Sequence, residues 1–316
     1  MRRGAASQRR FRAGLGALAL VPLLVAALAA PAAAALPAVT TSPATGVGAT
    51  SATLTGKVNP NNLATTYFFQ YGRTRTYGSQ TPTQGPTAAV KQNINVSAAV
   101  AGLAPGTTYH YRLVAVNSSG TRRGGDRTFT TTASVSLRLR PNPIVFGGAV
   151  LLFGQVFSGA PGGITVTLQE NPFPFAGFTV VATTRTDPLG RYSFSRAPGV
   201  NTRYVVVAST RPHSTQSAPH LVFVQIKLTL GVSSTRPRRG QGVTFSGTAT
   251  PSQNGRLVVI ERLVGRSWRI VGHARVRGTR YRTLVHIFAT GLYRTHVGHD
   301  ASHAPGTSVA RRLVVH

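Results

Sequence analysis

After residue 35, the sequence consists of short runs in which apolar and polar side chains alternate at every second position, and turn-forming residues separate these runs. In the stretch Leu103–Asn117 (LAPGTTYHYRLVAVN), Tyr109, Tyr111 and Leu113 fall on one face of an extended strand and His110 falls on the other. No helical period of about 3.6 residues persists beyond a turn or so. Short strands at regular spacing without intervening helices predict an all-β protein made of sandwiches.

The first 35 residues have the order of a secretory signal peptide. A basic segment, MRRGAASQRRFR, precedes an apolar run from Ala13 to Ala30, and the small residues PAAAA then offer a cleavage site near Ala35. The alternative is a permanent membrane anchor, but the short apolar run and the small residues after it favour cleavage. We therefore expect a mature chain that begins near Leu36, is secreted to the extracellular space or cell envelope, and makes no stable membrane insertion.

Composition excludes several kinds of site. The chain has no cysteine, so it holds no disulfide, no thiolate metal site and no catalytic cysteine. Only five residues are acidic, Asp126, Glu170, Asp187, Glu261 and Asp300, and no two of them share a motif. Glycoside hydrolysis needs two flanking carboxylates, and the sequence has no GxSxG, HExxH or phosphate-loop pattern. We expect a protein that is not an enzyme and that needs no cofactor.

The chain after the signal peptide (residues 1–35) divides into three segments of similar length, 36–133, 134–226 and 227–316. The second and third segments look like diverged copies of one another, because VSLRLRPNPIVFGGAVLLFGQV parallels KLTLGVSSTRPRRGQGVTFSGTA and ITVTLQ parallels LVVIER. Two copies of one supersecondary plan predict tandem domains. The expected architecture is three β-sandwich domains in tandem.

The first segment carries the pattern L-x-P-G-T-x-Y-x-Y-x-L-x-A-x-N, which resembles the E–F corner and strand F of fibronectin type III domains. The resemblance implies that Leu103 fills the core below the corner, that the Tyr109 hydroxyl bonds to nearby backbone, and that Tyr111 lies on the same face as Tyr109. Gly56 is a departure, because this family usually buries a tryptophan at that position. The aromatic residues of the strand TTYFFQYG are candidates to fill that volume.

In the second segment, the stretch DPLGRYSF resembles the turn-and-strand signature of carboxypeptidase-regulatory-like and related bacterial immunoglobulin-like domains. The resemblance implies that Asp187 and Gly190 make a tight turn, while Tyr192 and Phe194 pack inward. Modules of this kind recur in secreted bacterial proteins as spacers and surface repeats.

One cluster near the C-terminus, HVGHDASH, has the composition of a metal site. Its candidate ligands are His296, His299, Asp300 and His303, because imidazole and carboxylate groups at such spacing hold zinc or nickel. The alternative is a hairpin loop in which glycine, aspartate and proline are turn formers. We favour the loop, since the histidines would have to converge from a strand end and a loop.

Basic residues concentrate in the third segment: from Lys227 onward, 15 arginines and lysines stand against two carboxylates. A turn and a stripe of alternating residues supply the candidates for binding a polyanion, which are Arg236, Arg238, Arg239, Arg275, Arg277, Arg280 and Arg282. The alternative is a solvated sandwich face whose arginines reflect a GC-rich genome, with Trp268 in the core.

These observations lead to three functional hypotheses. The first is a non-catalytic secreted or cell-envelope protein that serves as a spacer, adhesin or matrix component. The second is a basic binding module for anionic envelope polymers, polysaccharide or extracellular nucleic acid. Nucleic-acid binding would be non-specific, because the sequence offers neither a recognition helix nor an aromatic stacking platform. The third is an accessory chain of an extracellular enzyme.

Overall fold

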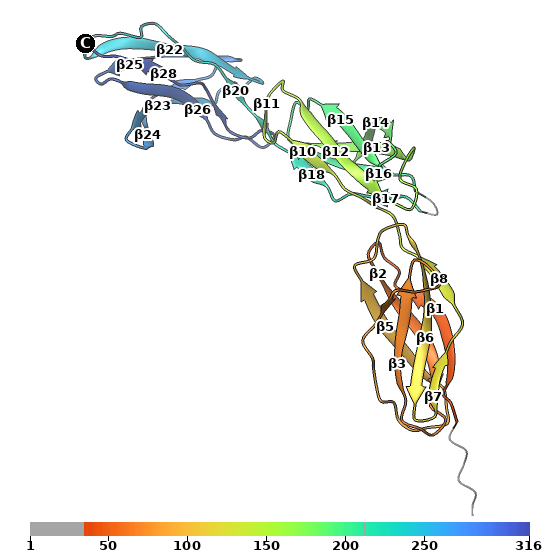
Figure 1. Cartoon of the computed structure of the whole chain (residues 1–316). Helices are drawn as coiled ribbons and strands as arrows, with labels where there is room; N and C mark the ends of the chain where they lie inside the picture. The colour runs from red at the N-terminus through yellow and green to blue at the C-terminus, as the bar shows by residue number, and fades with distance from the viewer. Residues whose placement is uncertain (1–34, 211–212) are drawn as a thin grey trace, which may run out of the picture.

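A computed structural model describes residues 35–210 and 213–316, and this part of the chain contains strands but no helix. The expected signal peptide lies outside the described residues. Figure 1 shows the strands gathered into three elongated modules that follow one another along the chain. We call them the first module (β1–β8), the second module (β9–β19) and the third module (β20–β28). The prediction of an all-β sandwich fold is confirmed.

The first module consists of two antiparallel sheets, in the orders β1-β2-β5 and β4-β3-β6-β7, and β8 also pairs with β6. Its strands are β1 (Ala38–Thr45), β2 (Ser51–Asn59), β3 (Thr66–Gly72), β4 (Ser79–Gln80), β5 (Ile94–Ala101), β6 (Thr108–Asn117), β7 (Gly120–Arg123) and β8 (Arg127–Thr130).

The alternation predicted for β6 places Tyr111 and Leu113 in the core, where both are fully buried. Tyr109 is also buried, and its hydroxyl accepts a hydrogen bond from the Ala104 amide at 3.0 Å. Leu103 lies in the same core cluster. A Cβ at Gly56 would lie 2.5 Å from Leu113 Cδ2. Leu113 therefore occupies the space next to Gly56, where the fibronectin type III pattern has a tryptophan.

The second module has sheets in the orders β10-β12-β15 and β14-β13-β16-β17, with β9 beside β12 and β18 beside β16. A short parallel pair, β11 and β19, completes it. Its strands are β9 (Ser134–Val135), β10 (Arg138–Arg140), β11 (Ile144–Val145), β12 (Val150–Phe157), β13 (Thr165–Pro172), β14 (Thr179–Arg185), β15 (Arg191–Arg196), β16 (Thr202–Ala208), β17 (Thr215–Gln216), β18 (His220–Val222) and β19 (Val224–Gln225).

The third module has sheets in the orders β20-β22-β21 and β24-β23-β26-β27, with β25 beside β22 and β28 beside β26. Its strands are β20 (Lys227–Leu228), β21 (Gly231–Val232), β22 (Gln241–Thr250), β23 (Leu257–Val264), β24 (Ser267–Arg275), β25 (Arg280–Ile287), β26 (Gly291–Val297), β27 (Gly306–Thr307) and β28 (Arg311–Leu313).

The second and third modules share their strand plan down to local irregularities. A bulge interrupts the β13–β14 hairpin after Leu168, and a bulge interrupts the β23–β24 hairpin after Ile260. In both modules a glycine of the long strand lets the chain between the first two strands of the module pass closely. A Cβ at Gly154 would lie 1.9 Å from the Ser136 carbonyl oxygen, and a Cβ at Gly247 would lie 1.9 Å from the carbonyl oxygen of Thr229.

A buried tyrosine completes this shared feature. The hydroxyl of Tyr192 donates to the Ser136 carbonyl, and the hydroxyl of Tyr281 donates to the Thr229 carbonyl. Each tyrosine hydroxyl therefore bonds the same carbonyl oxygen that lies close to the glycine. The two modules share this structural feature.

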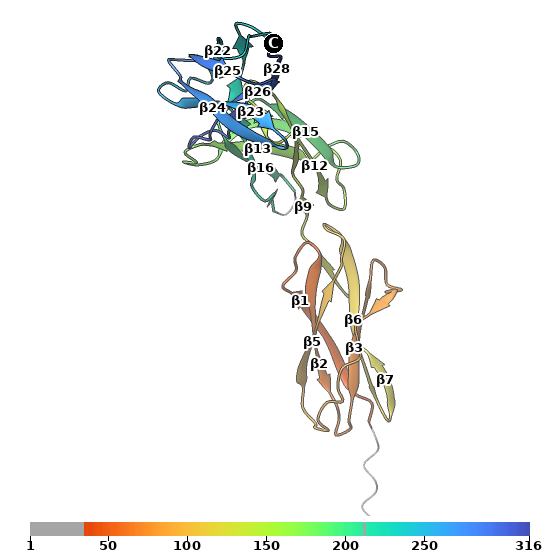
Figure 2. The same cartoon turned by 90° about the vertical axis from the view of Figure 1, so that its left-hand side faces the viewer.

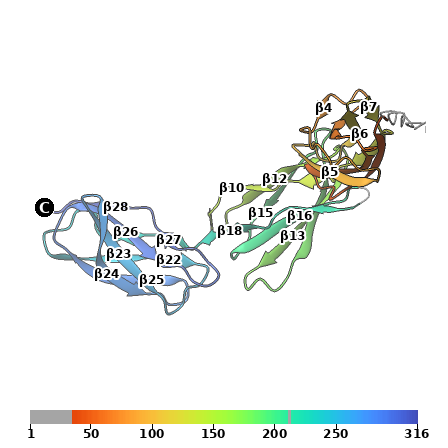
Figure 3. The same ribbon diagram turned by 90° about the horizontal axis from the view of Figure 1, so that it is seen from below.

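Backbone hydrogen bonds join the second module to the third. The Asn201 amide donates to the Ser302 carbonyl at 2.7 Å, and the Ala304 amide donates to the Val224 carbonyl at 2.8 Å. The amide of Ile226 donates to the Ala304 carbonyl at 3.1 Å, so Ala304 bonds to the chain on both sides of Gln225 in a parallel β-bridge. Figure 3 shows these two modules end to end, with the C-terminus at the far tip.

The first and second modules meet differently. Among the described residues, no hydrogen bond crosses this boundary, which the chain passes near β9 (Figure 2). The contact is a close approach of two turns, since a Cβ at Gly106 would lie 2.6 Å from the Cα of Ser158. The chain thus has one hydrogen-bonded joint and one joint made by contact alone.

Candidate functional site

A groove of about 790 Å³ lies on the third module where β22, β25 and the end of β24 meet. Four of the arginines predicted from the sequence line it, Arg275, Arg277, Arg280 and Arg282, and all four are exposed. A turn brings them together, because the backbones of Arg277 and Arg280 exchange hydrogen bonds of 2.8 and 3.0 Å. The Arg275 guanidinium is held at the rim by a 2.7 Å bond to the Gly255 carbonyl.

The electrostatics of this groove follow from its lining. Besides the arginines it consists of His273, Tyr281, Ala274, Gly247 and small hydroxyl residues, and it includes no carboxylate. Clustered guanidinium groups without an acidic neighbour create a positive potential that attracts oxyanions. Guanidinium groups also bind carboxylates and phosphates through paired hydrogen bonds. We call this surface the third-module groove.

The other predicted arginines lie apart from this groove. Arg236, Arg238 and Arg239 line a separate depression of about 670 Å³, together with Gln241 and the C-terminal His316. The Arg238 amide donates to the side chain of Gln241 at 2.8 Å, which fixes the turn before β22. The turn arginines and the stripe arginines therefore line two separate depressions.

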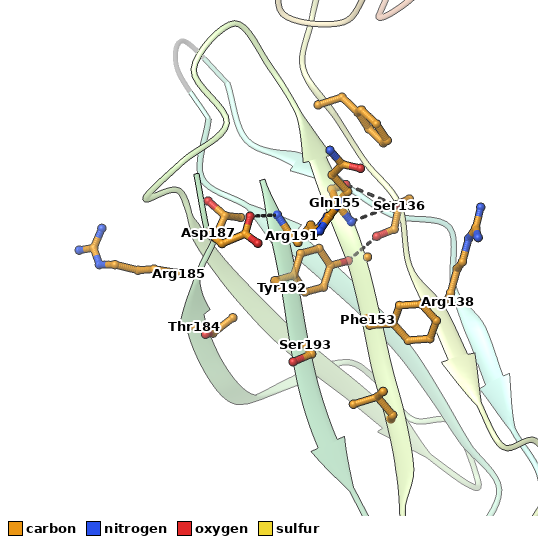
Figure 4. Close-up of a pocket in the computed structure, with 14 residues that line it drawn as sticks. Ser136, Arg138, Phe153, Gln155, Thr184, Arg185, Asp187, Arg191, Tyr192 and Ser193 are labelled. Carbon is orange, nitrogen blue, oxygen red and sulfur yellow. Dashed lines mark hydrogen bonds between the residues drawn. The ribbon is translucent and has the colours of Figure 1, made fainter. Parts of the chain in front are cut away.

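A second groove, of about 710 Å³, lies at the corresponding place on the second module. Figure 4 shows its lining, with Arg138 and Phe153 on one side and Arg185 on the other. We call it the second-module groove. Its arginines are Arg138, Arg185 and Arg191, all exposed. Sequence reasoning missed this site, although aligning the two repeats around GRYS and TRYR would have pointed to it.

Asp187 is the one acidic residue in the second-module groove, and the turn occupies its carboxylate. Its Oδ1 accepts hydrogen bonds from the amides of Leu189 and Arg191 at 2.9 and 2.8 Å. Gly190 follows in the left-handed conformation, with φ of 79°. Tyr192 and Phe194 after this turn are buried in the core of the second module.

The four candidate metal ligands do not converge. His303 is buried, and its Nδ1 lies 3.0 Å from Asp300 Oδ1 while its Nε2 faces the Gly199 carbonyl of the second module at 2.9 Å. His296 instead lies on β26 beside Thr307, at 3.2 Å, and His299 is exposed. Among residues 35–210 and 213–316, no group of three such side chains is placed to hold a metal.

Asp300 and His303 instead belong to the joint between the second and third modules. Burial opposes ionisation of Asp300, but hydrogen bonds from the Ser302 amide and hydroxyl and from the His303 ring outweigh it and lower the pKa of Asp300 to about 2. Arg256 lies 3.3 Å from the same carboxylate. Two of the four candidate metal ligands, Asp300 and His303, thus take part in a hydrogen-bond network at this joint.

The remaining carboxylates are also engaged with partners, each in a different place. Glu170 pairs with Arg196 at 3.1 Å, and Glu261 pairs with Arg294 at 2.7 Å. Asp126 of the first module accepts from the Tyr77 hydroxyl at 3.0 Å and lies 2.8 Å from His110 Nδ1. Burial opposes ionisation of Asp126, yet its hydrogen bonds and charged neighbours lower its pKa. No two carboxylates face each other across a cleft in the described residues.

The expectation that Trp268 lies in the core is wrong. Trp268 is only half-buried and lies outside the core cluster of the third module. The guanidinium of Arg294 covers its ring, with 4.0 Å from the arginine Cζ to the ring centre. A cation–π contact therefore holds this side chain at the surface.

No helix in the described residues is long and apolar enough to span a membrane. No protein-family model matches the sequence, and no curated protein matches it. Solved structures with some similarity to this chain include the following two. The sensor domain of the anti-sigma factor RsgI4 of Pseudobacteroides cellulosolvens is 20% identical, with 30% of this chain and 89% of that chain covered and a TM-score of 0.22. The FN1–FN3 domains of chicken CNTN1 are 12% identical, with 88% and 98% covered and a TM-score of 0.26.

Proposed function

We propose that this chain is a non-catalytic, modular bacterial protein of the extracellular space or cell envelope, which serves as a spacer, adhesion or matrix component. The observation that carries this proposal is the succession of three sandwich modules, two of which are joined through backbone hydrogen bonds. Such a joint keeps two modules in a fixed relation and gives the chain reach. The predicted signal peptide supports a location outside the cytoplasm.

The module types belong to the same proposal. The first module is fibronectin type III-like, which its sheet orders and the Tyr109 hydroxyl bond to Ala104 support. The second and third are bacterial immunoglobulin-like modules, which the shared plan and the turn from Asp187 to Gly190 support. The proposed absence of catalysis is supported by the five carboxylates, which lie in separate ion pairs or turns.

The test of this proposal is to fractionate the native cells and to measure the shape of the mature chain, residues 36–316, by small-angle X-ray scattering. We expect the protein outside the cytoplasmic membrane, with Met1 removed, and an elongated particle in which the second and third modules keep a constant distance. An intact Met1 on cytoplasmic protein, or scattering from a compact particle, would contradict the proposal.

A second candidate function is the binding of anionic envelope polymers, and the third-module groove favours it. Four arginines line one groove that includes no carboxylate. Binding driven by the release of counterions from a polyanion weakens steeply with salt and depends little on sequence or sugar identity. Nucleic acid would bind only through its phosphates.

The mature chain tests this candidate by its affinity for heparin across a range of salt concentrations. We expect Arg275, Arg277, Arg280 and Arg282 changed together to Ser to reduce the dependence of log K on log salt by about one per arginine. The matched control removes four positive charges from the first module, at Arg73, Lys91, Arg122 and Arg123, which are all exposed. Equal losses in the two variants would show a general charge effect and would reject the groove.

A further inference from the structure

The two grooves occupy equivalent places in the repeat, and two of their arginines correspond. Arg185 is the last residue of β14 and pairs with the first residue of β13. Arg275 is the last residue of β24 and pairs in the same way with the first residue of β23. Each also donates from Nη1 to a turn glycine, Arg185 to the Gly163 carbonyl at 2.9 Å and Arg275 to Gly255 at 2.7 Å. The same guanidinium is therefore held in the same way at the rim of both grooves.

The second corresponding arginine comes directly before the shared tyrosine. Arg191 precedes Tyr192, which pairs with Gly154, and Arg280 precedes Tyr281, which pairs with Gly247. Both arginines line their grooves and both are exposed. Since the glycine and tyrosine fix the backbone at this point, the two guanidinium groups start from equivalent positions.

We infer that the second-module groove is a second polyanion site, built on the same arginine pair and completed by Arg138 of β10. The inference rests on the function proposed for the third-module groove. Asp187 is the single carboxylate of this lining, and its Oδ1 accepts hydrogen bonds from two backbone amides. Three arginines against this one carboxylate leave the lining with a net positive charge.

Apolar side chains in the lining of the second-module groove indicate the class of polymer. Leu151, Phe153 and Phe157 line it beside the arginines, whereas the lining of the third-module groove includes no leucine or phenylalanine. Apolar side chains beside guanidinium groups suit the C–H faces and the oxyanions of an acidic polysaccharide. The Arg140 guanidinium already covers the Phe153 ring at 5.1 Å, so Leu151 and Phe157 are the apolar side chains open to a polymer.

The experiment uses the mature chain with Arg138, Arg185 and Arg191 changed together to Ser, and measures the salt dependence of its binding to two probes. Heparin represents an acidic polysaccharide, and long-chain inorganic polyphosphate offers oxyanions without sugar rings. The matched control changes Arg73, Arg122 and Arg123 to Ser, which removes the same charge from exposed positions of the first module. Circular dichroism and thermal unfolding verify that each variant is folded.

We expect the groove variant to reduce the salt dependence of heparin binding by about two to three, roughly one for each arginine, and the control to change it by less than one. If the groove variant reduces the salt dependence more for heparin than for polyphosphate, the apolar side chains of the groove contribute to binding a polysaccharide. An equal reduction for both probes assigns a site that binds oxyanions alone. Loss no greater than in the control, for both probes, overturns the inference. That outcome differs from failure of the third-module groove, which its own four-arginine variant reports.

Discussion

The second and third modules share one strand plan around their grooves, and they differ in the charge of the groove rims. Strand order, the hairpin bulge, the glycine and the tyrosine beneath the groove are the same in both. Around that shared frame, Asp187 and Ser193 of the second module correspond to Arg277 and Arg282 of the third. Burial and close backbone contact restrict the frame, whereas the exposed rim is free to vary, and the charge of the rim is where function can diverge.

The largest effect should come from the frame itself. Gly154→Ala and Gly247→Ala each place a methyl group 1.9 Å from a backbone carbonyl oxygen, which cannot move away as a side chain would. We expect each change to lower the free energy of unfolding of its own module by about 3 kcal/mol. Gly177→Ala is the control, because its Cβ would meet nothing within 4 Å.

The single tryptophan makes this prediction specific. Trp268 lies in the third module, so its fluorescence in a denaturant titration follows that module, while circular dichroism follows all three. Gly247→Ala should shift the fluorescence transition, and Gly154→Ala should shift a circular dichroism transition alone. If either alanine leaves its module unchanged, the close approach that defines the shared frame is absent.

The next effect concerns the joint that the copies form with each other. The lowered pKa of Asp300, about 2 against an ordinary value of 3.8, means that its ionised form stabilises the folded loop. This stability is complete above about pH 4 and is lost as the pH falls through 2, a change of roughly 2 kcal/mol. Loss of the carboxylate charge weakens the network of Arg256, Ser302 and His303 that holds the Gly199 carbonyl.

Hydrogen exchange at the joint measures this loss. The amides of Asn201 and Ala304, corrected for their intrinsic rates, should lose protection between pH 4 and pH 2, while amides in the core strands keep theirs. Asp300→Asn should give weak protection at the joint throughout this range and no further change with pH. Protection that stays constant down to pH 2 in the unchanged protein would contradict this account of the joint.

A third prediction exchanges one rim residue between the copies. Ser193→Arg gives the second-module groove the arginine that the third module has at the corresponding position, and Arg282→Ser makes the reverse change. We expect the salt dependence of heparin binding to rise by about one in the first variant and to fall by about one in the second. A rise in the salt dependence for Ser193→Arg and a fall for Arg282→Ser would show that the rim residues contact the polyanion. No change in either variant would show that they do not.

Particular residues explain how much of this could be predicted from the sequence. Alternation at Tyr109, Tyr111 and Leu113 predicted buried strands, because burial in a sheet imposes a period of two. Internal similarity pointed to the repeat, and local spacing placed four arginines on neighbouring strand faces. The joint was out of reach, since His303 meets Gly199 across 104 positions, and no local pattern records such a contact.

The second-module groove and Trp268 were missed for a different reason. Arg138 lies far in the sequence from Arg185 and Arg191, in a segment of modest charge, so only the fold brings the three together. Trp268 was expected in the core because large aromatic residues are usually buried. The Arg294 guanidinium over its ring provides a surface partner that the sequence does not reveal.

The smallest effect separates the two tyrosines of the shared frame. Each hydroxyl donates to the backbone of the preceding strand, but only Tyr281 also contacts a side-chain hydroxyl, that of Thr295, at 2.9 Å. Since the Tyr281 proton goes to the Thr229 carbonyl, Thr295 is the donor in this second bond. Thr295 is fully buried, so Tyr281→Phe leaves the Thr295 hydroxyl without that partner.

We expect Tyr192→Phe to lower the free energy of unfolding by about 1 kcal/mol and Tyr281→Phe to lower it by about 2 kcal/mol. Adding Thr295→Val should recover part of the loss in the third module, because the stranded hydroxyl is then removed. Denaturant titrations of the single and double variants measure this coupling, and equal costs for the two tyrosines would mean that the contact with Thr295 contributes nothing.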